Sequence, residues 1–249
     1  MMKKRKHEPV IIYFCAGSWT RRFPRGSLRC PISLFRNKYR ILVVEPPVTI
    51  LDYIKKTPRQ AILKKYGQLR RISGTKMTIF TPRVLLPYSV RLPFPRIIKN
   101  IILKLHVQLI SSQVKEIFRR LYKEKAIPDI VWGTIFHHAD LMEKTPSRKK
   151  LAIINDNFPL SPVFTKRVKK EAAQMESRLI TESDYIFTTS QTLLDEKSKL
   201  NPRAVLMENG VTRLFLPDYR KEREEFEKYS PEAEKNIIRD IGRLPHPRI

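Results

Sequence analysis

The first candidate for ligand binding is a glycine that follows a strongly apolar run near the N-terminus. In Ala16-Gly17-Ser18-Trp19, Gly17 and Ser18 are placed to contact a phosphate group. A glycine lets the backbone approach a phosphate closely, and a helix that begins behind it offers N–H groups without intrahelical partners. The sequence has neither G-x-G-x-x-G nor a Walker motif, so a tight strand-to-helix turn explains Gly17 equally well.

Two adjacent histidines, His137 and His138, follow the apolar run 129–135. A histidine there could hydrogen-bond a sugar hydroxyl or act as a base. Because neighbouring side chains point in different directions, at most one of the pair is expected to face a cleft. A helix-capping or surface role is an equal alternative.

Two polar groups follow later apolar runs. Asp156 comes directly after Leu151 to Asn155, and Asn209-Gly210-Val211 comes after Ala204 to Glu208. Asp and Asn-Gly favour turns for local reasons, which is the simpler interpretation of both. They belong to one site only if the strands before them end at the same edge of a sheet.

Short apolar runs rich in β-branched and aromatic residues predict the strands. They are Val10 to Ala16, Arg40 to Glu45, Ile127 to Ile135, Leu151 to Asn155, Tyr185 to Thr189 and Ala204 to Glu208. Most are apolar on both faces, which is typical of parallel strands covered on both sides by helices. The sequence therefore predicts an α/β fold with a doubly wound, mostly parallel, Rossmann-like sheet, whose carboxyl edge binds ligands.

Helical periodicity predicts three helices between these strands. The longest spans Arg96 to Lys125, with apolar residues at three- and four-residue steps. The second is expected over Pro162 to Ser183, with Ser161 as N-cap and Pro162 at the first helical position. The third covers Gln191 to Leu200. An irregular region precedes the long helix and contains a hairpin, Gln68 to Thr81, that turns at Ser73-Gly74.

Composition indicates a folded cytoplasmic protein. A hydrophobic fraction of 41% is enough for an ordinary core, and Cys15 and Cys30 are expected to be reduced thiols. The basic N-terminus followed by Val10 to Ala16 imitates a signal peptide, but Trp19 stands where a small cleavage residue belongs. No apolar run reaches the 18 or so residues of a transmembrane helix.

The charge of the chain is concentrated in its first part. Residues 217–249 contain eight acids and eight Lys and Arg residues, so residues 1–216 carry the whole net charge of +26. Such a field attracts polyanions, whether nucleic acid, anionic lipid headgroups or a phosphate-bearing substrate. Charge alone does not choose among them.

A series of short motifs occurs in a fixed order along the chain. They are Arg40-Ile41-Leu42-Val43-Val44-Glu45-Pro46-Pro47, Tyr66-Gly67-Gln68-Leu69-Arg70-Arg71, Ile79-Phe80-Thr81-Pro82 with Leu85-Leu86-Pro87, Glu182-Ser183-Asp184-Tyr185-Ile186-Phe187-Thr188-Thr189-Ser190, then Leu193-Leu194, Lys197, Asn201-Pro202 and Asn209-Gly210-Val211. Together they resemble the N-terminal domain of GT-B glycosyltransferases of the glycosyltransferase-4-like group. The resemblance covers almost the whole chain, and its strength is the co-linearity of the pieces.

The resemblance implies a role for each candidate residue. In such enzymes two Rossmann-like domains face each other across a cleft, the N-terminal one holding mainly the acceptor and the C-terminal one the nucleotide-sugar. The family would place Gly17 and Ser18 near the donor phosphates, one of His137 or His138 near the transferred sugar, and Asp156 at the cleft edge. Asn209 and Gly210 would lie at the interdomain crossover. Neither a metal nor a cofactor is expected, since the nucleotide-sugar is a substrate.

The sequence also departs from the family. Thr212 stands where relatives have the aspartate of "NGVD", and Asn155-Asp156-Asn157 replaces a more acidic run. Residues 1–216 are expected to form the N-terminal domain, and 217–249 a charged interdomain linker or helix leading to a missing C-terminal domain. We therefore expect the isolated chain to be inactive without a donor-binding half, in cis or in trans.

The resemblance and the charge favour sugar transfer from a nucleotide-sugar to a lipid-linked or anionic acceptor. The positive body and the Pro-rich loop Val84 to Pro95 would then place the protein peripherally at the inner membrane face. One alternative is a non-catalytic scaffold half of a split glycosyltransferase. Another is a basic nucleic-acid-binding module, but the aromatics are not interleaved with Lys and Arg and no RNA or DNA motif is present. No specific nucleic acid is expected as a partner.

Overall fold

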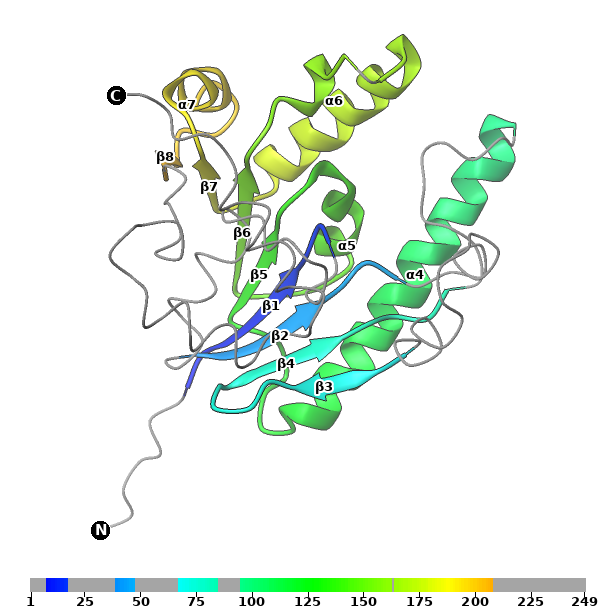
Figure 1. Ribbon diagram of the computed structural model, residues 1–249, viewed down its shortest axis with the longest axis vertical. Helices are drawn as coiled ribbons and strands as arrows, with labels where there is room; N and C mark the ends of the chain where they lie inside the picture. The colour runs from blue at the N-terminus through cyan, green and yellow to red at the C-terminus, as the bar shows by residue number, and fades with distance from the viewer. Residues whose placement is uncertain (1–7, 18–38, 48–66, 85–94, 163, 208–249) are drawn as a thin grey trace, which may run out of the picture.

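The computed structural model describes residues 8–17, 39–47, 67–84, 95–162 and 164–207. Within them, eight strands form one sheet in the order β3-β4-β2-β1-β5-β6-β7-β8 (Figure 1). The strands are β1 Val10–Phe14, β2 Arg40–Val44, β3 Leu69–Arg71, β4 Met77–Phe80, β5 Ile130–Gly133, β6 Lys149–Ile154, β7 Tyr185–Thr188 and β8 Ala204–Leu206. Every strand pair is parallel except β3 with β4.

The order of the strands reverses at β1, which lies between β2 and β5. From β1 the chain builds outward through β2 to β4, and later returns to β5 on the other side of β1. Phe14 is paired with Val44 of β2, and Tyr13 with Trp132 of β5. This is a doubly wound arrangement, as the apolar runs predict, and sheets of this kind bind ligands outside the carboxyl ends of the strands where the order reverses, here β1 and β5.

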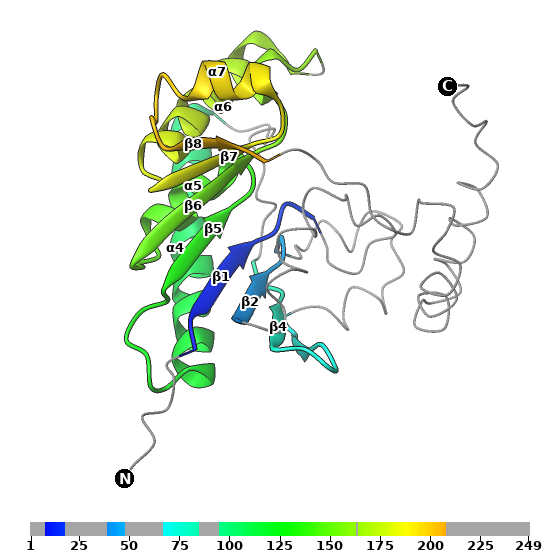
Figure 2. The same ribbon diagram turned by 90° about the vertical axis from the view of Figure 1, so that its left-hand side faces the viewer.

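The described helices gather on one face of this sheet (Figure 2). They are α4 Arg96–Leu121, α5 Ala139–Glu143, α6 Lys166–Thr181 and α7 Gln191–Lys197. Ile110, Met142 and Leu179 pack from three of these helices onto Ile12 and Phe14 of β1. A second cluster, containing Ile11, Tyr13 and Trp132, is buried on the other face. Both faces of the central strands are therefore covered, which explains why their sequences are apolar throughout.

Helix α6 begins later than the sequence predicts. Its N-cap is Thr165, whose hydroxyl accepts a hydrogen bond from the Val168 N–H at 3.4 Å, and the prediction of Ser161 as cap with Pro162 at the first helical position is wrong. The segment before it is occupied by a 3₁₀ turn, Phe158–Leu160, closed by a hydrogen bond from the Ser161 N–H to the Phe158 carbonyl. Because Ser161 serves that turn, it cannot begin the helix.

The predicted hairpin before the long helix is confirmed, and it also adds two strands to the main sheet. Gly74 has a φ of +68°, which favours glycine, and the Ile72 N–H donates to the Met77 carbonyl at 3.1 Å. Its second strand, β4, also pairs in parallel with β2. The segment that the sequence left as irregular is therefore part of the main sheet.

Several predictions fall on residues outside the described ranges. They concern Ser18, Cys30, most of the Pro-rich loop, Asn209 and Gly210, and residues 217–249. Among the residues that are described, no helix combines the length and the apolar composition needed to cross a membrane.

Two aspartates hold neighbouring strands together at the amino edge of the sheet. Asp129, before β5, accepts a hydrogen bond from the Val10 N–H of β1 at 2.8 Å and pairs with the buried ammonium of Lys125. Asp184, before β7, accepts from the Lys150 N–H of β6 at 2.8 Å and pairs with the exposed Lys149. Each aspartate thus accepts a backbone N–H from the neighbouring strand and pairs with a lysine, which is buried beside Asp129 and exposed beside Asp184.

We predict that Asp129→Ala destabilises the fold more than Asp184→Ala. Loss of the Asp129 carboxylate leaves a buried ammonium unpaired, at a cost of about 3–5 kcal/mol. Loss of Asp184 removes one backbone hydrogen bond and a screened ion pair, costing about 1–2 kcal/mol. Urea denaturation at pH 7 measures both, and equal losses would contradict the assignment.

The pH dependence of stability follows from the same contact. Burial would raise the pKa of Asp129, but the hydrogen bonds from Lys125 and the Val10 N–H outweigh it and hold that pKa below its usual value. The stabilisation is therefore complete above about pH 4 and is lost as pH falls through the lowered pKa. Denaturation curves of Asp129→Ala should be less sensitive to pH in that acidic range than those of the unaltered protein.

Candidate functional site

The candidate site lies where β1 and β5 end side by side at the reversal of strand order. Thr134 follows β5. Its hydroxyl donates a 3.0 Å hydrogen bond to the carbonyl of Phe14, which is the last residue of β1. Both groups are buried. The hydrogen bond fixes the two strand ends to each other, so groups that follow them have defined positions.

His138 lies directly over this junction. Its Nδ1 accepts a hydrogen bond from the Thr134 N–H at 3.0 Å, and its ring centroid is 5.7 Å from that of Phe14. Because Nδ1 is the acceptor, the proton of the neutral ring is assigned to Nε2. His138 therefore offers an N–H donor, and no nitrogen lone pair remains to accept a proton.

Burial sets the charge of this histidine. Only 7% of His138 is exposed, and burial, with a smaller effect of the neighbouring His137, lowers its pKa to about 3. The ring is neutral at any physiological pH. Of the two roles that the sequence leaves open, hydrogen bonding to a hydroxyl fits this environment and action as a base does not.

A glycine makes this placement of His138 possible. A β-carbon on Gly133 would lie 2.3 Å from Met142 Sδ and 3.3 Å from His138 Cβ. Met142 is itself buried, so its sulfur has little space to move. The absence of a side chain at Gly133 lets α5 and the turn that carries His138, Phe136–His138, pack directly on β5.

Gly17 lies at the same edge, beyond the end of β1. The last ladder bond of that strand runs from the Cys15 N–H to the Val44 carbonyl at 2.9 Å, two residues before Gly17. A β-carbon on Gly17 would have no neighbour within 4 Å among the described residues. Gly17 and His138 are the two candidates that the topology brings to the junction of β1 and β5.

The other described candidates lie differently. His137 is half-buried, and its ring lies beside that of Phe136, tilted by 44° with centroids 4.0 Å apart. Asp156 is exposed beyond the end of β6, and its backbone carbonyl accepts from the Phe158 N–H at 3.0 Å. The backbone at Asp156 thus forms a turn, while its carboxylate faces solvent. It shares the carboxyl edge with His138, one strand further out.

Two buried polar atoms at this edge were missed from the sequence. Asn155 Oδ1 and Thr188 Oγ1, at the ends of β6 and β7, have no hydrogen-bond partner among the described residues. Buried polar atoms are normally satisfied, so each is a place where a water or ligand hydroxyl would be stabilised. The sequence signal that could have identified them is a polar residue at the end of an apolar run. Thr134 stands in the same place after β5.

Glu45 is a carboxylate at this edge that is already in use. It is buried at the end of β2 and accepts hydrogen bonds from Thr81 Oγ1 at 2.7 Å and Arg70 Nη2 at 3.1 Å. These contacts connect β2 to the hairpin strands. Within the described ranges, no three His, Cys, Asp or Glu side chains come together in a way that could hold a metal ion.

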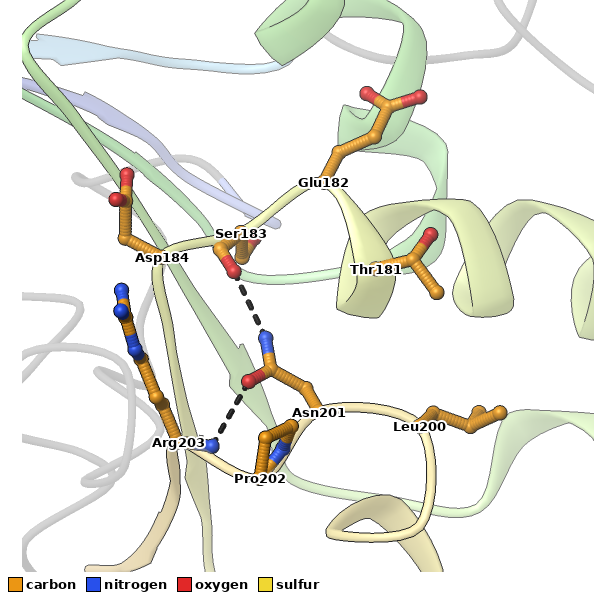
Figure 3. Close-up of a pocket in the computed structure, with 8 residues that line it drawn as sticks. All are labelled: Thr181, Glu182, Ser183, Asp184, Leu200, Asn201, Pro202 and Arg203. Atoms are coloured by element: carbon orange, nitrogen blue, oxygen red, sulfur yellow. Dashed lines mark hydrogen bonds between the residues drawn. The ribbon is translucent and has the colours of Figure 1, made fainter.

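A separate pocket of about 380 Å³ lies at the opposite, amino edge of the sheet (Figure 3). Its central residue, Asn201, donates to the Ile180 and Ser183 carbonyls at 2.9 and 2.8 Å and accepts from the Arg203 N–H at 2.9 Å. These bonds join the end of α6 to the start of β8. The motif residues Asp184 and Asn201 thus support the fold at this edge.

No family model and no curated protein matches this chain. Similar solved structures include sucrose-phosphate synthase from Thermosynechococcus elongatus, with a TM-score of 0.48, 9% identity, and coverage of 92% of this chain and 54% of that one. A UDP-N-acetylglucosamine 2-epimerase from Rickettsia bellii has a TM-score of 0.47 at 12% identity, covering 96% of this chain and 52% of that one. A ugt transferase from Siraitia grosvenorii in complex with UDP has a TM-score of 0.44 at 10% identity, covering 89% and 55%.

The chain spans about half the length of these three proteins. The TM-scores lie below 0.5 and the identities between 9% and 12%, so nothing about the activity of this chain follows from the similarity.

We predict opposite effects for alanine at the two glycines of the site. Gly133→Ala forces Met142 and His138 away from β5 and destabilises the fold by about 1–3 kcal/mol. Gly17→Ala meets no atom of the described residues, so its free energy of unfolding is expected to stay within about 0.5 kcal/mol of the unaltered protein. Its methyl group occupies the space that a phosphate would approach, and binding of a phosphate-bearing ligand weakens. Urea denaturation and calorimetric titration separate the two effects; a stable Gly133→Ala would contradict the packing argument.

Proposed function

We propose that this chain is the acceptor-side half of a glycosyltransferase of the GT-B type. It would transfer a sugar from a nucleotide-sugar to an acceptor that is anionic or lipid-linked. The observation that carries the proposal is the junction of β1 and β5, where a neutral histidine donor, His138, is fixed over the strand ends that Gly17 follows. The co-linear motifs along the sequence, which resemble that family, support the same proposal.

The polar groups at this edge suit a sugar better than a charged small molecule. His138 offers an Nε2–H donor, Asn155 an amide oxygen, and Thr188 a hydroxyl that can donate or accept. Sugar hydroxyls both donate and accept, so such a mixed set can satisfy them. At Gly17 no described atom lies within 4 Å of the β-carbon position, and the proposal places the phosphates of the donor there.

Asp156 is the group that we propose as the proton acceptor. It is exposed at the end of β6 and makes no ion pair with any described residue, so its carboxylate is accessible to an acceptor hydroxyl. His138 would act by hydrogen bonding to the transferred sugar, because its ring cannot take a proton near neutral pH. The acceptor oxygen would attack the anomeric carbon as the nucleoside diphosphate leaves. The proton of the acceptor hydroxyl would pass to Asp156.

The donor nucleotide requires a second half, supplied in cis or in trans. In the proposed arrangement this chain holds the acceptor and contacts only the phosphates and sugar of the donor. The isolated chain is therefore expected to bind nucleotide-sugars weakly and to transfer nothing. A half that docks its partner without contributing to chemistry is the alternative that the experiment must separate.

The test titrates the purified chain with a panel of nucleotide-sugars, alone and mixed with a donor-binding half, and measures both binding and sugar transfer. We expect transfer only in the mixture. In that mixture Asp156→Asn should lower transfer at least 100-fold, because the base is lost. Asp195→Asn, an exposed aspartate on α7 that hydrogen-bonds Gln191, is the matched control and should transfer normally. Transfer that is unaffected by Asp156→Asn would reduce this chain to a docking half.

A further inference from the structure

Helix α4 is much longer than the strands it covers. Its 26 residues span about 39 Å, whereas a strand of five residues spans about 17 Å. The helix starts after β4, at the carboxyl edge, and its N-terminal half extends past the strand ends (Figure 1). This half therefore projects on the side of the molecule that carries the candidate site.

The projecting half of α4 exposes a row of large aliphatic side chains. We call it the α4 apolar stripe: Ile97, 75% exposed, Ile98, 46%, Ile101, 53%, Leu105, 58%, and Leu109, 43%. Four of its members recur every four residues, so they lie on one side of the helix. Val107, Ile110 and Val114 face the core instead. The helix is thus apolar on two sides, and only one of them is used by the fold.

Cations follow the stripe along the same helix. Lys104 is exposed beside it, and Lys115, Arg119 and Arg120 are exposed one to three turns beyond Leu109. The whole helix contains six Lys and Arg residues and a single acid, Glu116. An aliphatic surface bordered by positive charge is complementary to an anionic lipid bilayer, with the side chains among the acyl chains and the cations at the headgroups.

A groove continues the stripe towards the sheet. It has a volume of about 430 Å³ and is lined by apolar side chains, two basic ones and one acid, among them Val84, Leu109, Arg83, Arg120 and Glu116. Gln113 fixes its wall, because its side-chain amide accepts from the Arg83 N–H and donates to the Arg83 carbonyl, both at 2.9 Å. The surface is thus built on a rigid frame beside the end of β4.

We propose that the α4 apolar stripe, with Lys115, Arg119 and Arg120, docks this protein on an anionic membrane surface. A bilayer fits better than a protein partner because the stripe consists of Ile and Leu alone. It lacks the Trp and Tyr anchors that dominate protein interfaces, and Leu is under-represented among such anchors. The net charge of +26 draws the whole chain to the same surface.

This docking has a consequence for the candidate site, which rests on the proposed function. The stripe lies on the N-terminal half of α4, which follows β4 at the edge of the sheet where β1 and β5 also end. Docking would hold the site towards the bilayer. The acceptor would then be a lipid-linked molecule presented from the membrane, with its anionic headgroup near Arg83 and Arg120.

The experiment is flotation of the full chain with vesicles of phosphatidylcholine, with and without phosphatidylglycerol. We expect binding to the anionic vesicles that weakens with salt, and little binding to the neutral ones. The variant Ile101→Ser with Leu105→Ser should lose roughly tenfold in affinity for each aliphatic removed. Leu160→Ser with Leu200→Ser removes two comparably exposed leucines elsewhere and should bind normally.

A charge-matched pair tests the cations. Lys115→Gln with Arg119→Gln should lose roughly fivefold for each cation. Lys166→Gln with Lys170→Gln makes the same change in net charge on exposed positions of α6 and should lose much less. Equal losses in the two charge variants, or in the two aliphatic variants, would overturn the proposal. It is also overturned if the stripe variant alters only the oligomeric state, since the stripe would then be an interface between copies.

Failure of membrane docking is distinguishable from failure of the proposed function. Vesicle binding requires neither a donor nor a donor-binding half, and sugar transfer to a water-soluble acceptor requires no vesicles. Flotation without sugar transfer would support the docking surface and contradict the proposed glycosyltransferase function. Sugar transfer without flotation would support the proposed function and contradict membrane docking.

Discussion

The close approach of α5 to the centre of the sheet is the constraint on which the site depends. It exists because Gly133 has no side chain, so Met142 Sδ occupies the space where a β-carbon would lie and His138 Cβ lies close beside it. That packing buries His138 and directs its Nδ1 to the Thr134 N–H. Burial then keeps the ring neutral, and the hydrogen bond fixes the proton on Nε2. The missing side chain thus contributes to the position of His138, while burial sets its charge and the Thr134 N–H its tautomer.

Beside β5, β6 and β7 the polar groups that fix the strands differ between the two edges of the sheet. At the amino edge, Asp129 and Asp184 use full charges to hold neighbouring strands. At the carboxyl edge beside β5, β6 and β7, the buried groups are uncharged: a histidine, an amide and a hydroxyl. A neutral edge can accommodate a sugar without the cost of desolvating a charge, while the basic surface outside attracts the anionic partner.

The sheet could be predicted from the sequence because buried parallel strands leave a local signal. Strands such as β1 and β2 are apolar on both faces, and that pattern is independent of distant contacts. The start of α6 could not be predicted, since Ser161 and Thr165 are both good caps and the 3₁₀ turn at Phe158–Leu160 decides between them. Nor could the state of His138, because it depends on Gly133, Met142 and Phe14 meeting in space.

The central claim is that ligands bind at the carboxyl ends of β1 and β5. Backbone amide NMR of the isotope-labelled chain, titrated with nucleotide-sugars to millimolar concentration, tests it most directly, because binding of the donor phosphates and sugar shifts the nearest amides. The account predicts concentration-dependent shifts at Gly17, Thr134 and His138, with Ser183 and Asn201 at the opposite edge unmoved. Shifts confined to Ser183 and Asn201, or no shift at all, would contradict it.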